Sequence, residues 1–144
     1  MDERVDVVDI KTVSLAAAQR AAEAALNSAR ESGIAVVAVV LNAVGQVLVV
    51  LRMDGVGEVA LENATAKARG ALTFRRTTAA LAEYFATDLM LGPPMQTRPH
   101  ILAVEGGDVL KAADGTVIGA IGISGAHHSQ DNKVVEAAIA ALTG

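Results

Sequence analysis

The 144-residue sequence contains no cysteine, and only 2% of its residues are aromatic. Without cysteine the chain has no thiolate for metal binding, nucleophilic catalysis or redox chemistry. The aromatic residues are Phe74, Tyr84 and Phe85, which are too few to form a platform on which nucleic-acid bases stack. The core must therefore be built from alanine, valine, isoleucine and leucine.

Positive charge is also scarce: 12 lysines and arginines face 16 acidic residues, for a net charge of -4 and a pI near 5.3. This balance excludes the basic footprint of a nucleic-acid-binding protein. The longest apolar run, residues 34–41, is far too short to span a bilayer, and residues 1–4 do not begin a signal peptide. We therefore expect a cytoplasmic protein with no nucleic-acid or membrane partner. A mean hydropathy of +0.41 predicts a homo-oligomer, between a dimer and an octamer, that hides apolar surface between subunits.

The apolar patterns predict an α/β (α+β) fold. Helical spacing indicates helices over residues 15–29, 58–74, 77–86 and 132–142, and apolar runs indicate strands over 34–41, 46–53, 100–104, 109–112 and 116–124. The apolar pattern of residues 5–10 predicts either an edge strand or an arm. Short connections favour antiparallel neighbours, so we predict one domain over residues 1–144 with a central, mostly antiparallel five-stranded sheet flanked by helices. Gly92-Pro93-Pro94 predicts an irregular rim loop, because proline lacks a backbone donor.

One stretch organises the rest of the chain: DGTVIGAIGISG at residues 114–125, followed by a polar loop and Gln130-Asp131. Together with SLAAAQ at 14–19, RMDG at 52–55 and AKARGA at 66–71, it resembles the GlcG/HbpS-like family, which includes the C-terminal domain of PduO proteins. The resemblance implies a profilin-like α/β domain that forms homo-oligomers and binds a small molecule. It also implies haem as a cofactor, because characterised relatives bind haem, and a place in a catabolic pathway. No haem ligand carries over from the family by position.

The polar loop carries two of the three histidines, His127 and His128, just before the last helix. A helix N-terminus favours neutral imidazole, which suits a metal or haem-iron ligand or a general base. In an extended backbone the two side chains would point to opposite faces. Two interpretations remain open, a functional pair and a solvated loop pair, and Ser129 is the expected N-cap of the helix.

Other candidates would complete a site for an anionic ligand. Arg52 and Arg75 have the planar guanidinium that suits a carboxylate or a haem propionate. Asp54 and Glu58 are further candidate ligand-binding residues, although Arg52 could equally pair with either of them. Gly122, Ser124 and Gly125 either line the site or permit close packing, and His100 is either a pocket partner or a surface residue. Glu58 and Glu62 could hold a metal only with a third ligand, so the metal is left unassigned.

These residues support two hypotheses. In the first, the chain is a small-molecule binding protein, with haem the implied ligand and one histidine on the iron. In the second, it is a small enzyme that performs isomerisation, deamination or hydrolysis of a carboxylated metabolite, with aromatic degradation as a candidate setting. His127 or His128 would then be the acid/base and Arg52 or Arg75 would hold the carboxylate.

Overall fold

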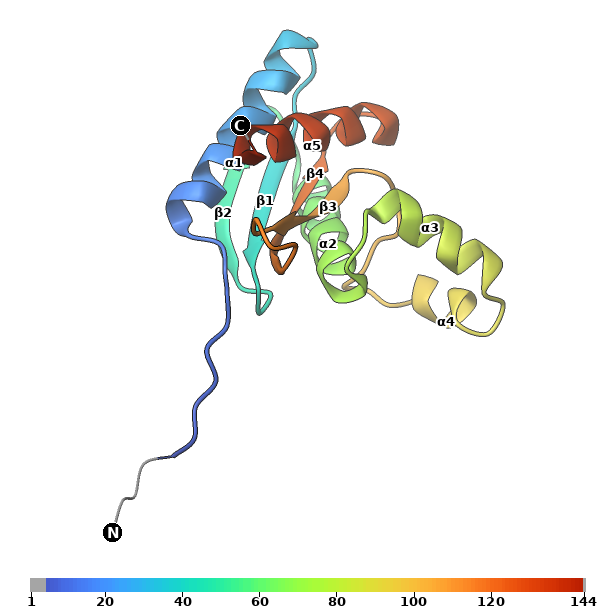
Figure 1. Ribbon diagram of the computed structural model, residues 1–144. Coiled ribbons are helices and arrows are strands. Elements are labelled where there is room, and N and C mark those ends of the chain that lie inside the picture. The colour runs from blue at the N-terminus through green and yellow to red at the C-terminus, as the bar shows by residue number, and fades with distance from the viewer. Residues whose placement is uncertain (1–4, 144) are drawn as a thin grey trace.

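A four-stranded antiparallel sheet in the order β2-β1-β4-β3 forms the centre of the computed structural model, which describes residues 5–143 (Figure 1). The described elements are, in chain order, α1 (Leu15–Glu31), β1 (Val37–Asn42), β2 (Val47–Arg52), α2 (Glu58–Phe74), α3 (Thr78–Thr87), α4 (Gly92–Gln96), β3 (Gly107–Lys111), β4 (Val117–Ser124) and α5 (His128–Thr143). The predicted class, an antiparallel sheet flanked by helices, is confirmed.

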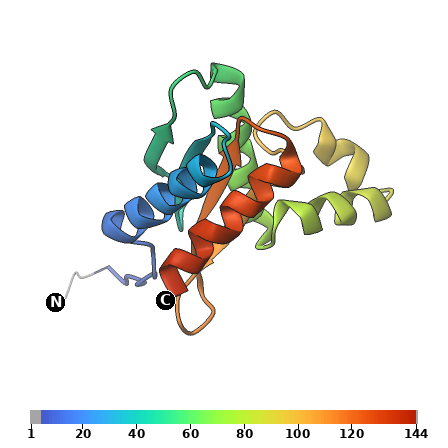
Figure 2. The same ribbon diagram turned by 90° about the horizontal axis from the view of Figure 1, so that it is seen from above.

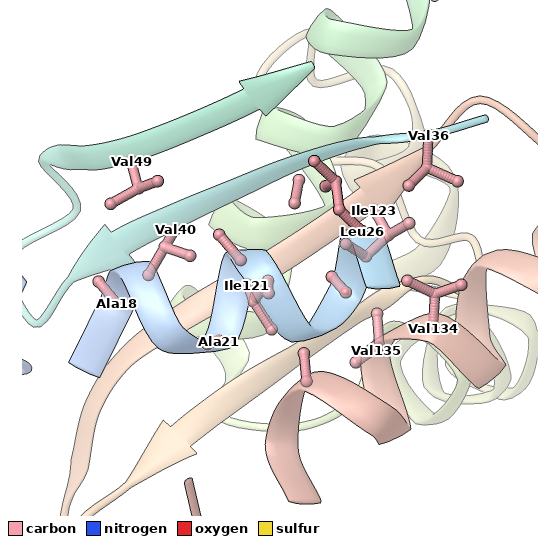
Figure 3. Packing of buried hydrophobic residues seen from close by; sticks show 14 of the residues in the cluster. Ala18, Ala21, Leu26, Val36, Val40, Val49, Ile121, Ile123, Val134 and Val135 are labelled. Atoms are coloured by element: carbon pink, nitrogen blue, oxygen red, sulfur yellow. The ribbon is translucent and has the colours of Figure 1, made fainter. Parts of the chain in front are cut away.

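Helices cover both faces of this sheet, which explains the unbroken apolar run of β1. Ala38 and Val40 point into a core shared with α1 and α5, and Figure 3 shows Val40, Ile121 and Ile123 between the sheet and these two helices. Val39 and Leu41 point to the opposite face, where α2 packs. The view from above (Figure 2) shows α1 and α5 lying side by side on their face.

Small residues bring the layers close together. Five alanines of α1 have no exposed surface: Ala18, Ala21, Ala22, Ala25 and Ala29. The remaining helices, α3 and α4, extend to one side of the sheet (Figure 1). They enclose a smaller apolar cluster of Leu81, Phe85 and Met95, in which the rings of Phe74 and Phe85 meet edge to face at 5.3 Å.

Four strands are present in residues 5–143, not the five expected, because residues 100–104 do not join the sheet. Their segment packs against α2 instead: the amide of Leu102 donates to the carbonyl of Ala66, and Ile101 lies against Gly70. Residues 5–10 form no strand either, and they leave the body of the protein as an extended arm (Figure 1).

Two further expectations need correction. The segment around Gly92-Pro93-Pro94 is not an irregular loop, since it forms the short helix α4 with its prolines in the first turn. There the missing N–H has no intrahelical partner to lose. The last helix begins at His128, four residues earlier than expected. Within residues 5–143, no helix combines the length and apolar character needed to cross a bilayer.

Candidate functional site

The carboxyl end of β4 and the start of α5 form the candidate site. Gly125 turns the chain out of β4 with a φ of +127°, and a Cβ there would lie 2.7 Å from the carbonyl oxygen of Ala35. Glycine is therefore required by the backbone at this turn. The turn carries the chain directly into the two histidines.

His127 and His128 lie together on the surface, with ring centroids 4.1 Å apart. The alternation expected of an extended backbone does not apply here, because α5 begins at His128. The prediction that Ser129 is the N-cap of this helix is wrong. The Nδ1 atom of His127 accepts the amide of Ser129 at 3.3 Å and lies 2.8 Å from its hydroxyl oxygen, so His127 caps the helix.

His128 has a carboxylate partner that the sequence analysis did not identify. Its Nδ1 atom lies 3.5 Å from an oxygen of Glu105, and both side chains are partly exposed. Glu105 precedes β3 on a loop that is fixed to β4, because the amide of Ile123 donates to the carbonyl of Gly106 at 2.7 Å. The amide of Gly107 donates to the hydroxyl of Thr78 at 2.8 Å. The pair thus joins two anchored loops.

Beneath the histidines lies a buried ion pair between Lys67 of α2 and Asp131 of α5. The two residues are 2% and 1% exposed, and Nζ lies 3.1 Å from Oδ2. Lys67 also donates to the carbonyl of Ile123 at 2.8 Å. The second carboxylate oxygen of Asp131 accepts the amide of Ala126 at 3.2 Å. The pair therefore connects α2, the end of β4 and the turn that leads to His127.

Burial dominates the electrostatics of this pair. Loss of hydration lowers the pKa of Lys67, and the charge of Asp131 opposes that change. Loss of hydration likewise raises the pKa of Asp131, opposed first by Lys67 and then by the amide of Ala126. Both pKa shifts arise because a medium of low polarity penalises the charged form. Each residue therefore depends on the opposite charge of the other to stay ionised.

Some of the expected site residues share this end of the sheet. Val37 pairs with both Arg52 and Ser124, so these two side chains lie two strand spacings apart, roughly 10 Å. Arg52 forms an exposed ion pair with Glu58, one of the two partners that the sequence left open. Asp54 lies in the exposed turn between them.

Gly122 sits deeper, under α2. A Cβ on Gly122 would lie 1.9 Å from the carbonyl oxygen of Ala64 and 2.8 Å from the amide of Ala68. These contacts favour the packing interpretation of this glycine, which the sequence left open beside a ligand role. Its ligand role stays a prediction.

The other two expected residues lie elsewhere. Arg75 lines a hollow of about 470 Å³ with Thr116 and Val117, at the start of β4. Because β4 has eight residues, roughly 20 Å or more separates Arg75 from the histidines at its far end. His100 lies over α2, in a hollow of about 330 Å³ with Glu62 and Arg69.

Lys67, Glu105 and Asp131 are the residues that sequence reasoning missed. Lys67 did carry a signal, because it interrupts a helical stripe of alanines in AKARGA, where a lysine is expected to be paired if buried. Residues 5–143 contain no group of three or more His, Asp or Glu side chains able to hold a metal ion. Within this part of the chain, protein side chains alone therefore provide no binding site for the metal that the sequence analysis left unassigned.

Comparison with known proteins identifies the family. The family model described as "Haem degrading protein HbpS-like" matches residues 13–140. The crystal structure of HbpS superimposes with a TM-score of 0.88 and 30% identity, covering 99% of each chain. The crystal structure of a PduOC:heme complex gives a TM-score of 0.81 and 27% identity, covering 90% of this chain and 94% of the other.

A protein of Citrobacter freundii, named for its position in the dhaT-dhaS intergenic region, is 30% identical over 130 residues, which are 90% of this chain and 92% of the relative. The family match spans nearly all of the sheet and its covering helices, and the expected resemblance is confirmed. The chain belongs to the HbpS-like family.

Proposed function

We propose that this protein binds haem and that His128 supplies the iron ligand through its Nε2 atom. The relative crystallised as a PduOC:heme complex and the family's description support haem as the ligand class. The observation that carries the choice of residue is the contact between Glu105 and the Nδ1 atom of His128. A histidine that binds a metal through one nitrogen usually has its other nitrogen held by a carboxylate or carbonyl.

The residues present fit a haem iron. Within residues 5–143, the hydrogen bonds and the ion pair of the two imidazoles all use Nδ1, so Nε2 of each ring is left for coordination. His127 is the weaker candidate, because its Nδ1 atom caps α5 and pairs with a serine instead of a carboxylate. Bound haem supplies iron redox chemistry, while His128 would hold the iron and Glu105 would orient the imidazole.

Arg52 is the proposed partner for an acidic group of the ligand. It lies at the same end of the sheet as Ser124, whereas Arg75 lies at the other end of β4. A guanidinium suits a carboxylate through two parallel hydrogen bonds. Arg52 now pairs with the exposed Glu58, and an exposed pair of this kind is weak enough to be exchanged for a ligand.

We also propose that the protein works as a homo-oligomer. The edge strand β2 pairs Val50 with the buried Val39 on the α2 side of the sheet, yet Val50 is 43% exposed and Val59 of α2 is 68% exposed. A second copy that covers this strip would bury both. Sedimentation velocity tests the proposal: Val50→Asp should shift the protein to a smaller species, and an unchanged distribution would contradict an interface there.

Titration with ferric haem, followed by absorbance, tests the ligand. We expect a Soret shift in the native protein that is lost in His128→Ala and weakened in Glu105→Ala. His100→Ala is the matched control, which should retain the shift. If His128→Ala gives the native Soret position and affinity, the proposed ligand is wrong. If the native protein gives no Soret shift at all, haem binding itself is refuted.

The Glu105–His128 contact favours one alternative, a general base. A carboxylate beside Nδ1 favours the tautomer in which the lone pair of Nε2 can accept a proton, as the second sequence hypothesis requires for a carboxylated metabolite. Turnover of small carboxylic acids by the native protein, lost in His128→Ala, would support an enzyme. Turnover that is equal in both proteins would remove His128 from that role.

A further inference from the structure

The buried pair of Lys67 and Asp131 contacts both loops that carry the proposed site. On one side, Asp131 accepts the amide of Ala126, the residue before His127. On the other side, the pair packs against the loop of Glu105: a Cβ on Gly106 would lie 2.9 Å from Nζ of Lys67 and 3.0 Å from Cβ of Asp131. The two loops therefore meet on one buried ion pair.

We propose that Lys67 and Asp131 are positioning residues that hold His128 opposite Glu105. Their use in haem binding rests on the function proposed above, whereas the positioning is a property of the protein without ligand. Each charged group makes two contacts, and each contact is with a different segment. Lys67 donates to Ile123 at the end of β4 and to Asp131 in α5, and Asp131 in turn holds the turn at Ala126.

An apolar pair would fill the same space without these connections. Buried ion pairs are often no more stabilising than well-packed apolar residues of similar volume, so stability alone does not explain a lysine in an alanine-rich helix. The contact with the Ala126 amide is directional, because the acceptor must lie close to the line of the N–H bond. That direction fixes the turn from which the histidines project.

Two double variants separate positioning from stability. Lys67→Met/Asp131→Asn removes both charges but keeps an oxygen that can accept the Ala126 amide. Lys67→Met/Asp131→Leu removes both charges and the acceptor. Neither leaves an unpaired buried charge, which is the change that most destabilises a protein. If the leucine variant does not fold, Lys67→Met/Asp131→Ala, which adds no bulk, replaces it with the same expectation.

The first measurement needs no ligand: nuclear Overhauser contacts between the His128 ring and the side chain of Glu105, recorded by NMR in each full-length variant. In the native protein the Nδ1 atom of His128 lies 3.5 Å from an oxygen of Glu105, so these contacts report the position of the ring. Both double variants lack the charge of Asp131, so a difference between them comes from the acceptor for the Ala126 amide. We expect the contacts to persist in the asparagine variant and to disappear in the leucine variant. Equal contacts in both double variants would overturn the inference.

The second measurement is haem affinity of the same proteins. Loss of a partner that orients a metal-binding histidine typically costs about 10- to 100-fold in affinity. We expect this loss in the leucine variant relative to the asparagine variant, and equal affinities would count against the inference. If the NMR difference is found but no protein binds haem, the proposed function fails while the positioning role of Lys67 and Asp131 stands.

Discussion

Adding one methyl group at Gly122 should destabilise the protein strongly, because this glycine is where β4 touches the backbone of α2. A Cβ at this position would lie 1.9 Å from the carbonyl oxygen of Ala64, 2.8 Å from the amide of Ala68 and 2.9 Å from the carbonyl carbon of Ala64. All three are backbone atoms. No side chain can rotate away to make room for the methyl group.

The magnitude follows from the required movement. Non-bonded carbon contacts settle at roughly 3.5 Å, so α2 would have to move outward by roughly 1.5 Å. That movement would disturb the apolar layer around Val39 and Ala120 and pull Lys67 away from Ile123. Extra methyl groups in a packed core typically cost about 1–3 kcal/mol, and we expect Gly122→Ala to cost about 3 kcal/mol. For a chain of this size the melting temperature should fall by roughly 6–12 °C.

Thermal and urea unfolding followed by circular dichroism measure this effect. Gly57→Ser is the matched control: Gly57 is the N-cap of α2, and a Cβ there has no neighbour within 4 Å among the described residues. Serine at an N-cap can accept a free amide, so the control should be neutral or slightly stabilising. If Gly122→Ala melts with the native protein but binds haem differently, the packing argument is refuted and the ligand interpretation of Gly122 gains support.

Three other substitutions test the electrostatics. Lys67→Met alone should cost about 3–5 kcal/mol in the free energy of unfolding, since it leaves the carboxylate of Asp131 buried and unpaired. Its urea midpoint should recover as the pH is lowered and Asp131 is protonated, and a pH-independent loss would contradict this. Burial raises the pKa of Asp108, so native stability should fall as pH rises through that raised pKa. Asp108→Asn should therefore be more stable relative to the native protein at pH 7 than at pH 3. By contrast, removing Arg52 from its exposed pair with Glu58 should cost less than about 1 kcal/mol, and a larger loss in urea unfolding would show that the pair is structural.

Local pattern was enough to predict most of the fold. The apolar run at residues 34–41 predicted a strand, and its lack of polar residues agrees with the burial of β1 on both faces. The antiparallel pairing of β1 with β2 was predicted from their short connection, and Asn42 stabilises the turn between them by accepting the amides of Val44 and Gln46. Residues 100–104 have an equally apolar pattern, but contacts with α2 determine their conformation, and no local signal carries that information.

The candidate site shows the same division. His127 and His128 were predicted from their position before the last helix. Their partners could not be predicted, because contacts between distant segments create them: Lys67 and Asp131 are 64 positions apart. Composition does not reveal which acidic residue faces a lysine, and the bend that brings Glu105 to His128 depends on the positive φ of Gly106. Arg75 failed to join the histidines for a similar reason, since β4 places it at the other end of the sheet.

Resonance Raman spectroscopy of the ferrous haem complex tests the central claim most directly, because the iron–imidazole stretching band reports the ligand itself. We predict this band in the native protein, its absence in His128→Ala, and its return when free imidazole is added to that variant. His127→Ala and His100→Ala should keep the band. A native complex without the band, or the same band in His128→Ala before imidazole is added, would contradict ligation of haem iron by His128.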